Sequence, residues 1–262
     1  MSIRFGACIG IDLDKLTALR DCGYSYAETS LSAVAGLSDS EFDSFLISAK
    51  NAGIPIEACN GFFPADIKIV GDSVDYDLVA AYTKRALARA SALGVRVAVL
   101  GSAKSRAVPD GFDRKTAEEQ FVTALRVCGD IAAACGIGIA IEPLRTGECN
   151  FVNTVAEGLE LCARADHPAV GCLADFYHVF MNGESMDAVA HSNGRLIHTH
   201  IARANADRLY PHSSEDEAAC RVWAQALRDC GYRGRMSLEG RSGDDFAAMI
   251  QKAKEYLNIF NA

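Results

Sequence analysis

The segment that determines the fold reads Ile137-Gly138-Ile139-Ala140-Ile141-Glu142-Pro143-Leu144-Arg145-Thr146-Gly147-Glu148. An unbroken apolar run rich in β-branched residues is typical of a strand that is buried on both faces. The run ends at Glu142, and a proline and a glycine-containing turn follow it. A carboxylate at the edge of a core is costly unless it is paired or bound to a metal, so Glu142 needs an explanation beyond packing.

Three later segments repeat this arrangement, in which an apolar strand carries a metal-competent residue at its C-terminal end. The runs and their end residues are 170–174 with Asp175, 196–199 with His200, and 235–238 with Glu239. One acidic residue at a strand end is an ordinary solvated residue. Four metal-competent residues at equivalent places on four successive strands are difficult to explain by packing alone, and they indicate a shared site.

The composition excludes several classes of protein. The chain has 262 residues, of which 50% are hydrophobic, and its formal net charge of −8 argues against a nucleic-acid-binding surface. No apolar run is long enough to cross a membrane, and the N-terminus enters a strand without the layout of a signal peptide. The 10 cysteines include no C-x-x-C pair, so we expect buried, reduced thiols and a cytoplasmic protein.

Periodicity predicts eight strands that alternate with eight helices. The expected strands span residues 5–10, 24–28, 54–59, 95–100, 137–142, 170–175, 196–200 and 235–239. The expected helices span residues 14–22, 39–52, 75–93, 114–135, 154–164, 186–191, 215–230 and 244–259. Alternation of this kind predicts a parallel sheet, and eight repeats in this length predict an α/β fold in which residues 1–262 form a single (β/α)8 TIM barrel. No G-x-G-x-x-G follows the first strand, which argues against a dinucleotide-binding sheet.

In this fold the active site lies at the C-terminal ends of the strands, so the four end residues should converge there. Three carboxylates and one imidazole form a mainly hard oxygen site, which suits Mn²⁺ or Mg²⁺ and can also hold Co²⁺ or Zn²⁺. Without a cation, three converging carboxylates would raise one another's pKa. We therefore expect one divalent metal ion, Mn²⁺ in preference, bound by Glu142, Asp175, His200 and Glu239.

Other polar residues follow the same strands. Glu148 lies six residues after the first of the four end residues, and His178 lies three residues after the second. Arg203 and Arg208 lie in the long loop after the third. The structural alternatives are a capping or packing histidine for His178, a solvated loop carboxylate for Glu148 and a surface charge for Arg208. His198 should point to the same side of its strand as His200, either as a neighbour of the metal or as a residue that fills the barrel.

The motifs that carry most information are Ile141-Glu142-Pro143-Leu144, Asp175-Phe176-Tyr177-His178, His198-Thr199-His200 and Ser237-Leu238-Glu239. With these motifs, nearly the whole chain resembles the xylose-isomerase-like superfamily, especially the sugar isomerase and epimerase branch that includes ketose 3-epimerases and inosose isomerases. The resemblance implies a metal held by the Glu, Asp, His and Glu at the ends of strands five to eight. It also implies that Glu148 and His178 bind substrate, since they match the spacings of the 3-epimerases. The arginine that binds substrate after the third ligand has no clean match, and Arg208 is our candidate.

The expected activity is metal-dependent epimerisation of a small sugar. The ion would polarise a chelated carbonyl and stabilise the enediolate, while Glu142 and Glu239 on two sides of the sugar remove and return a proton. If only one face has a competent base, the outcome would be aldose–ketose or inosose isomerisation. We expect an unphosphorylated sugar, because Asp244 and Asp245 open the last helix, where they would repel a phosphate.

Two other classes remain as alternatives. An endonuclease IV-like DNA repair enzyme would need a multi-zinc cluster and a basic face, which six histidines and an acidic chain do not favour. A non-catalytic sugar-binding barrel would not need the intact set of four ligands. We expect no nucleic-acid or membrane partner, and a homodimer or homotetramer is compatible with the resemblance.

Overall fold

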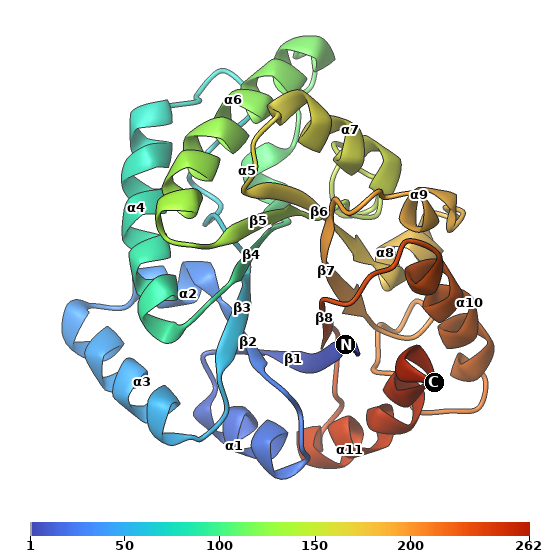
Figure 1. Ribbon diagram of the computed structural model, residues 1–262. Coiled ribbons are helices and arrows are strands. Elements are labelled where there is room, and N and C mark those ends of the chain that lie inside the picture. Colours follow the sequence, from blue (N-terminus) through green and yellow to red (C-terminus); the bar gives the residue numbers. More distant parts are fainter. Residues whose placement is uncertain (1) are drawn as a thin grey trace.

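Eight short parallel strands close into a barrel in the order of the chain, with β1 paired to both β2 and β8 (Figure 1). The computed structural model describes residues 2–262. Its strands are β1 Arg4–Gly10, β2 Ala27–Ser30, β3 Ile56–Asn60, β4 Val97–Leu100, β5 Gly138–Ile141, β6 Val170–Asp175, β7 Leu196–Ile201 and β8 Arg235–Leu238. The predicted (β/α)8 TIM barrel is therefore confirmed.

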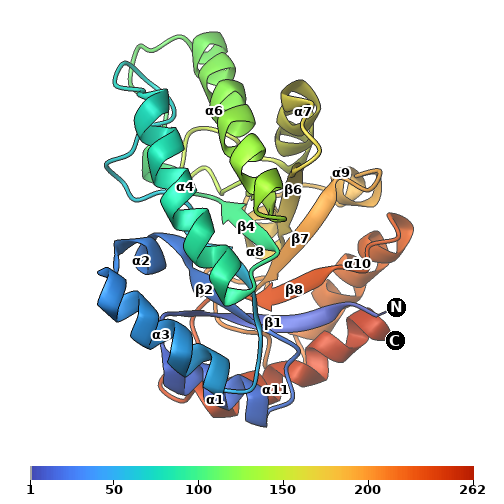
Figure 2. The same ribbon diagram turned by 60° about the vertical axis from the view of Figure 1, so that its left-hand side comes forward.

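Helices surround the barrel on all sides, as Figures 1 and 2 show from two directions. They are α1 Leu13–Asp21, α2 Leu31–Gly36, α3 Asp39–Asn51, α4 Tyr76–Leu93, α5 Ala103–Arg106, α6 Arg114–Ala134, α7 Val155–Ala165, α8 Phe176–Met181, α9 Asp187–Ala190, α10 Asp216–Asp229 and α11 Phe246–Leu257, with a final 3₁₀ helix, η1, at Asn258–Asn261. The eight expected helices are all present. Within residues 2–262, no helix has both the length and the apolar character needed to cross a bilayer.

Three short helices were not predicted. α2 and α8 have 6 residues and α5 has 4, so none of them is long enough to show helical periodicity in the sequence. All three follow the C-terminal ends of strands. α8 begins directly after Asp175, whose side chain accepts a hydrogen bond from the backbone N–H of Tyr177 at 2.8 Å and so caps the helix.

The longer helices begin and end at residues that satisfy their free backbone groups. Ser38 and Glu41 form a reciprocal capping box at the start of α3, and Thr154 and Glu157 form a second one at the start of α7. Gly94 ends α4 with φ of +98°, a conformation that costs a residue with a side chain more than it costs glycine. The long helices were predicted from their apolar periodicity, and these caps fix where they begin and end.

Apolar side chains form two separate cores. The larger core lies between the barrel and its ring of helices, and a small cluster of Val97, Val99, Ala140 and Leu173 is distinct from it. Because alternate residues of a strand point to opposite faces, these four side chains fill the inside of the barrel. Polar side chains occupy other positions in this interior, and they form the site described below.

The second strand differs from its predicted bounds. It was expected at residues 24–28 with Glu28 as its last residue, but β2 spans Ala27–Ser30. Glu28 is fully buried in the middle of the paired segment, where β1 and β3 flank it. The predicted bounds were wrong because a charged residue usually marks the end of a buried strand. Here buried partners stabilise the charge of Glu28 within the strand.

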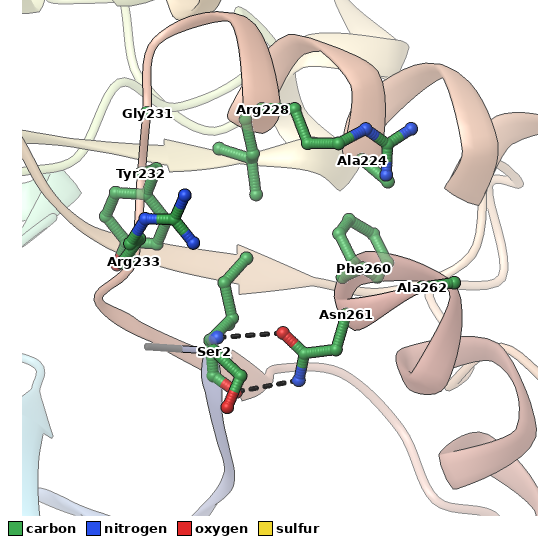
Figure 3. A pocket seen from close by; sticks show the side chains of 11 residues that line it. Ser2, Ala224, Arg228, Gly231, Tyr232, Arg233, Phe260, Asn261 and Ala262 are labelled. Atoms are coloured by element: carbon green, nitrogen blue, oxygen red, sulfur yellow. Dashed lines mark hydrogen bonds between the residues drawn. The ribbon is translucent and has the colours of Figure 1, made fainter.

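The N-terminal end of the barrel brings the two ends of the chain together (Figures 1 and 2). Asn261 accepts a hydrogen bond from the backbone N–H of Ile3 at 2.8 Å and donates one to its carbonyl at 3.0 Å. Figure 3 shows the adjacent cavity of about 480 Å³, whose lining includes Arg228 and Tyr232. This cavity lies where the strands begin, at the end of a TIM barrel that serves stability rather than catalysis.

Arg89 ties α4 to the end of α2. Its side chain is almost fully buried, and Nη1 donates to the carbonyl oxygens of Val34, Ala35 and Leu37 at 2.9, 3.2 and 2.7 Å. Its Nη2 pairs with Asp39 at 2.6 Å. The last carbonyls of a helix have no partner within it, so Arg89 provides the donors that α2 lacks.

We expect R89M to lower the free energy of unfolding by about 3 kcal/mol, because the carbonyl oxygens of Val34 and Ala35 would lose their charged donor while that of Leu37 keeps Arg85 at 3.2 Å. Urea denaturation followed by circular dichroism would measure the change. R85M is the matched control, since Arg85 lies one turn earlier on α4 with a side chain that is 58% exposed, and we expect a loss of about 0.5 kcal/mol or less. Equal stability of the two variants would show that Arg89 does not serve as the cap of α2.

Candidate active site at the C-terminal end of the barrel

The barrel brings the four residues predicted as metal ligands to one place. Asp175 ends β6, His200 lies near the end of β7, and Glu142 and Glu239 directly follow β5 and β8. In the sheet, Asp175 pairs with His200, and His200 pairs with the residue two before Glu239, so the side chains reach similar heights. One potential ligand atom from each residue lies within 4.8 Å of the other three.

His200 connects the two glutamates. Its Nδ1 lies 3.1 Å from Glu142 Oε1 and 3.2 Å from Glu239 Oε2, and the imidazole is fully buried. Burial alone would lower the pKa of His200, but Glu239, Glu28 and Glu142 outweigh it and raise the pKa well above its usual value. In this arrangement a proton on Nδ1 partly neutralises the two carboxylates, in the place where a cation would do the same.

Glu28 lies on the other side of the same imidazole. Its Oε1 is 3.0 Å from His200 Nε2, and its Oε2 is 2.8 Å from His198 Nε2. Burial would raise the pKa of Glu28, but the two imidazoles lower it below its usual range. His198 is fully buried, which lowers its own pKa. Of the two interpretations left open for His198, the structure shows a residue that fills the barrel and binds Glu28.

The two glutamates that flank His200 have different surroundings. Burial and the negative charge of Glu239 raise the pKa of Glu142. Glu239 is also desolvated, but the charges of His200 and Arg208 outweigh this and hold its pKa well below the usual value. Asn60, at the end of β3, donates a further hydrogen bond to Glu239 Oε1 at 2.8 Å. Glu239 is thus the better stabilised of the two as a carboxylate.

Arg208 extends into the site from the loop after β7. Its Nη2 lies 2.6 Å from Glu239 Oε2 and 3.0 Å from Asp175 Oδ2, and the guanidinium carbon lies 4.7 Å from the centre of the Tyr177 ring. Arg203, by contrast, is directed into its own loop and donates to Asp216 at 3.1 Å. The structure therefore places Arg208, and not Arg203, next to the predicted ligands.

The backbone of Arg208 is held in an unusual conformation by the next loop. Its φ is +51°, in the left-handed region, and its carbonyl accepts a hydrogen bond from the backbone N–H of Arg241 at 2.8 Å. A Cβ on Gly240 would collide with this carbonyl, so the close approach of the two loops requires glycine there. The contact fixes the direction in which the arginine leaves the loop.

His178 and Glu148 lie beside the ligand set, as their spacing from it predicted. His178 is buried, with Nε2 3.4 Å from Asp175 Oδ2 and 4.0 Å from Glu148 Oε2. Glu148 is about one-third exposed, forms a 2.7 Å ion pair with Arg145, and lies 3.8 Å from Arg208 Nη1. Both residues line a cavity of about 260 Å³ together with Glu142, Glu239 and Arg208.

Three residues that organise the site were not predicted from the sequence. Glu28 and Asn60 come from β2 and β3, in the half of the barrel that supplies none of the predicted ligands. Arg106 of α5 is fully buried and donates to the carbonyl oxygens of Glu142 at 2.6 Å and Leu100 at 3.1 Å. The cost of burying a charge, which singled out Glu142, applies equally to Glu28, but β2 reads Ala-Glu-Thr-Ser and has no apolar run that marks it as buried.

The donor set fits a divalent cation. Three carboxylates offer hard oxygen ligands, and His200 Nδ1 faces the same point while its Nε2 faces a carboxylate. An imidazole that gives one nitrogen to a metal and donates from the other to a carboxylate is a common arrangement in metalloproteins. Glu142, Asp175, His200 and Glu239 could therefore hold an ion such as Mn²⁺ or Mg²⁺.

The fold and this site define a TIM barrel with a carboxylate-rich site at the C-terminal ends of its strands. Residues 16–259 match the xylose isomerase-like TIM barrel family, and the chain belongs to that family.

Relatives and solved structures extend the comparison. The chain is 28% identical over 132 residues to the D-psicose 3-epimerase of Ruminiclostridium cellulolyticum, an alignment that covers 49% of this chain and 43% of that protein. It is 29% identical over 130 residues to the 3-dehydro-D-guloside 4-epimerase of Escherichia coli, with 49% and 47% covered. In both alignments the chain spans less than half of the relative's length. The D-psicose 3-epimerase of Clostridium cellulolyticum H10 with D-tagatose has the same fold, at a TM-score of 0.83 and 19% identity over 99% of this chain and 98% of the other.

Gly101, directly after the neighbouring strand β4, leaves the space that the Glu142 side chain needs. A Cβ on Gly101 would occupy the space of the Glu142 carboxylate. We expect G101A to weaken Mn²⁺ binding about tenfold or more because it displaces a predicted ligand. Thermal stability should change little, because a flexible carboxylate can move away.

Calorimetric titration with Mn²⁺ and thermal unfolding would separate the two effects. G36A is the control, because a Cβ on Gly36 at the end of α2 has no heavy atom within 4 Å. Unaltered Mn²⁺ affinity in G101A would mean that the position of the Glu142 carboxylate does not matter for the ion.

Proposed function

We propose that this protein is a divalent-metal-dependent sugar epimerase or isomerase, and that it acts as a ketose 3-epimerase on a free sugar. The observation that carries the proposal is the pair of glutamates on two sides of His200 Nδ1, at 3.1 and 3.2 Å, in a cavity that also exposes polar side chains. The names of the relatives, a 3-epimerase and a 4-epimerase of sugars, support the same class of reaction.

The cofactor we propose is one Mn²⁺ ion, held by Glu142, Asp175, His200 and Glu239. Such an ion supplies Lewis-acid polarisation of a sugar carbonyl, which acidifies the neighbouring C–H group. Its charge would also compensate the carboxylates that His200 and Arg208 neutralise in this structure. Mg²⁺, Co²⁺ and Zn²⁺ are the other ions that this donor set suits.

Glu142 and Glu239 are the residues that we propose as general base and general acid. They follow β5 and β8 and reach His200 from different strands, so a sugar between them would present one face to each carboxylate. One glutamate removes the proton from the carbon, and the other delivers a proton to the opposite face, which inverts the configuration. Positioned groups of this kind typically contribute about 10²–10⁴-fold each to the rate.

Glu148, His178 and Arg208 are the residues that we propose to bind the sugar. All three line the cavity, and each has a polar group near the ligand set without being one of the four converging residues. The buried His178 is held close to Asp175, so its position should be rigid. Glu148 and Arg208 are partly exposed, which suits contacts to hydroxyl groups farther from the metal.

The geometry of the last helix supports an unphosphorylated sugar. Asp245 accepts a hydrogen bond from the backbone N–H of Ala248 at 2.9 Å and caps α11. The N-terminus of this helix is the place where barrels often bind phosphate, and a carboxylate already satisfies it. A phosphate ester would also approach the acidic residues of the site.

Isomerisation of an aldose or an inosose is the second candidate, and one feature favours it. Glu239 lies within hydrogen-bonding distance of three groups, on Asn60, Arg208 and His200, at 2.8, 2.6 and 3.2 Å. A carboxylate held by so many donors is a weaker base than Glu142. If only Glu142 transfers protons, the product would be an isomer rather than an epimer.

Incubation with Mn²⁺ and a panel of ketopentoses, ketohexoses, inososes and their phosphate esters in D₂O tests the proposal. We expect the 3-epimer of a free ketose with deuterium at C3, and about one metal ion per chain in protein purified without chelator. E239Q should lose most of the metal and at least about 100-fold in turnover. Deuterium at C2 of an aldose product would establish isomerisation, and undiminished metal in E239Q would remove Glu239 from the ligand set.

E148A and H178A separate substrate binding from metal binding. Both side chains border the cavity outside the group of four converging residues, so we expect at least about tenfold lower kcat/KM for the sugar with nearly wild-type Mn²⁺ content. Metal analysis and steady-state kinetics on the same preparations would measure the two quantities. Loss of the ion in H178A would contradict the assignment of His178 to the sugar.

A further inference from the structure

Glu28 is a fully buried carboxylate of the barrel interior with no assigned role. Its side chain reaches from β2 to β7, where its two oxygens lie 3.0 Å from His200 Nε2 and 2.8 Å from His198 Nε2. Apolar side chains fill the interior elsewhere, as Val97 and Leu173 do. A buried charge is costly in such a position, and a hydrophobic residue would fill the space at lower cost, so packing alone does not account for Glu28.

The contacts of Glu28 determine where the protons of the two histidines lie. An ionised carboxylate can only accept hydrogen bonds, so Nε2 of both His198 and His200 must carry a proton. A neutral His200 then has its lone pair on Nδ1. That nitrogen faces Glu142 Oε1 and Glu239 Oε2, which is the centre of the predicted ligand set.

We propose that Glu28 is a positioning residue that holds His200 in the tautomer and orientation in which Nδ1 can bind the metal. The inference rests on the proposed metal-dependent function, and it assigns to β2 a part in a site whose predicted ligands all come from β5 to β8. A carboxylate that accepts from the distal nitrogen of a metal-bound imidazole also makes the imidazole a stronger ligand.

His198 completes the arrangement by fixing Glu28. Each carboxylate oxygen has one imidazole partner, so the carboxylate cannot rotate without breaking a hydrogen bond. The rings of His198 and His200 lie 5.0 Å apart in an edge-on arrangement, on the same face of β7. Two histidines two residues apart on β7 and one carboxylate from β2 therefore form one buried, hydrogen-bonded unit.

An amide at position 28 would disturb this unit without changing its size. The glutamine of E28Q can accept through its oxygen from one imidazole, but its NH₂ group would face the nitrogen of the other. When the NH₂ group faces His200, Nε2 must become the acceptor, and the proton moves to Nδ1, where it blocks the metal. When the NH₂ group faces His198, His200 keeps its tautomer but loses the charged acceptor that makes its imidazole a stronger ligand. We expect E28Q to raise the Kd for Mn²⁺ by about 10–100-fold, measured by calorimetric titration at constant pH.

E57Q is the matched control. Glu57 lies at the start of β3, at the opposite end of the same barrel, and its carboxylate pairs with Arg4 at 2.6 Å and Arg235 at 2.7 Å. The same change from carboxylate to amide should therefore leave the Kd for Mn²⁺ at its wild-type value. A Kd that rises equally in E28Q and E57Q would show a general effect of removing a paired carboxylate from the barrel and would overturn the inference.

A second measurement does not depend on the folding of E28Q. The ¹⁵N NMR spectrum of the wild-type protein, labelled at histidine and loaded with Zn²⁺, should show His200 bound through Nδ1 with a protonated Nε2. Zn²⁺ bound through Nε2 of His200 would overturn the inference, and so would a wild-type Kd for Mn²⁺ in E28Q. Both of these results would leave the proposed function intact, whereas wild-type protein that neither binds Mn²⁺ nor converts any sugar would overturn the function and this inference together.

Discussion

Four carboxylates share the C-terminal end of this barrel, and the repulsion among them is the constraint that the surrounding residues satisfy. Glu28, Glu142 and Asp175 are buried, and Glu239 is only 17% exposed at its side chain. Their negative charge is opposed by His200, which lies between three of them, and by the guanidinium of Arg208. Such a concentration of charge is costly in a protein interior even when the charges are paired. Its presence here therefore indicates a function. The arrangement of the loops and of the second strand follows from this need.

Closure of the barrel is what makes this compensation possible. Glu28 and His200 are 172 residues apart in the chain and meet only because β1 joins β2 to β8. Asn60 and Glu239 meet in the same way across 179 residues. The predicted ligands lie on one half of the barrel, and the groups that orient two of them come from the other half. Any opening of the sheet between β1 and β8 would therefore separate the ligands from their supports.

The sequence predicted the features that depend on short segments. The alternation of strands and helices, the long helices and the four strand-end residues are all visible in local patterns, since each element carries its own signal. The roles of Glu28, Asn60 and Arg106 depend on contacts across the barrel, which no local pattern reports. The bounds of β2 were wrong for the same reason, because the partners that stabilise Glu28 come from β7. The choice between Arg203 and Arg208 was also beyond the sequence, because the pairing of their loop with Gly240 and Arg241 decides it.

The converging carboxylates and the residues that shape the rest of the cavity lie on different parts of this structure. The converging carboxylates stand at or directly after strand ends, where paired neighbours fix their positions. Glu148 and Arg208 lie in loops, and the lining of the same cavity also includes Gly61, Gly101 and Ala103, which offer little side chain to a ligand. A change in these loops or a larger residue at Ala103 would alter which ligand fits the cavity without replacing any of the carboxylates. Gly101 is the exception, because its missing side chain leaves the space that Glu142 occupies. At this position, therefore, the shape of the cavity and the chemistry of the site cannot vary independently.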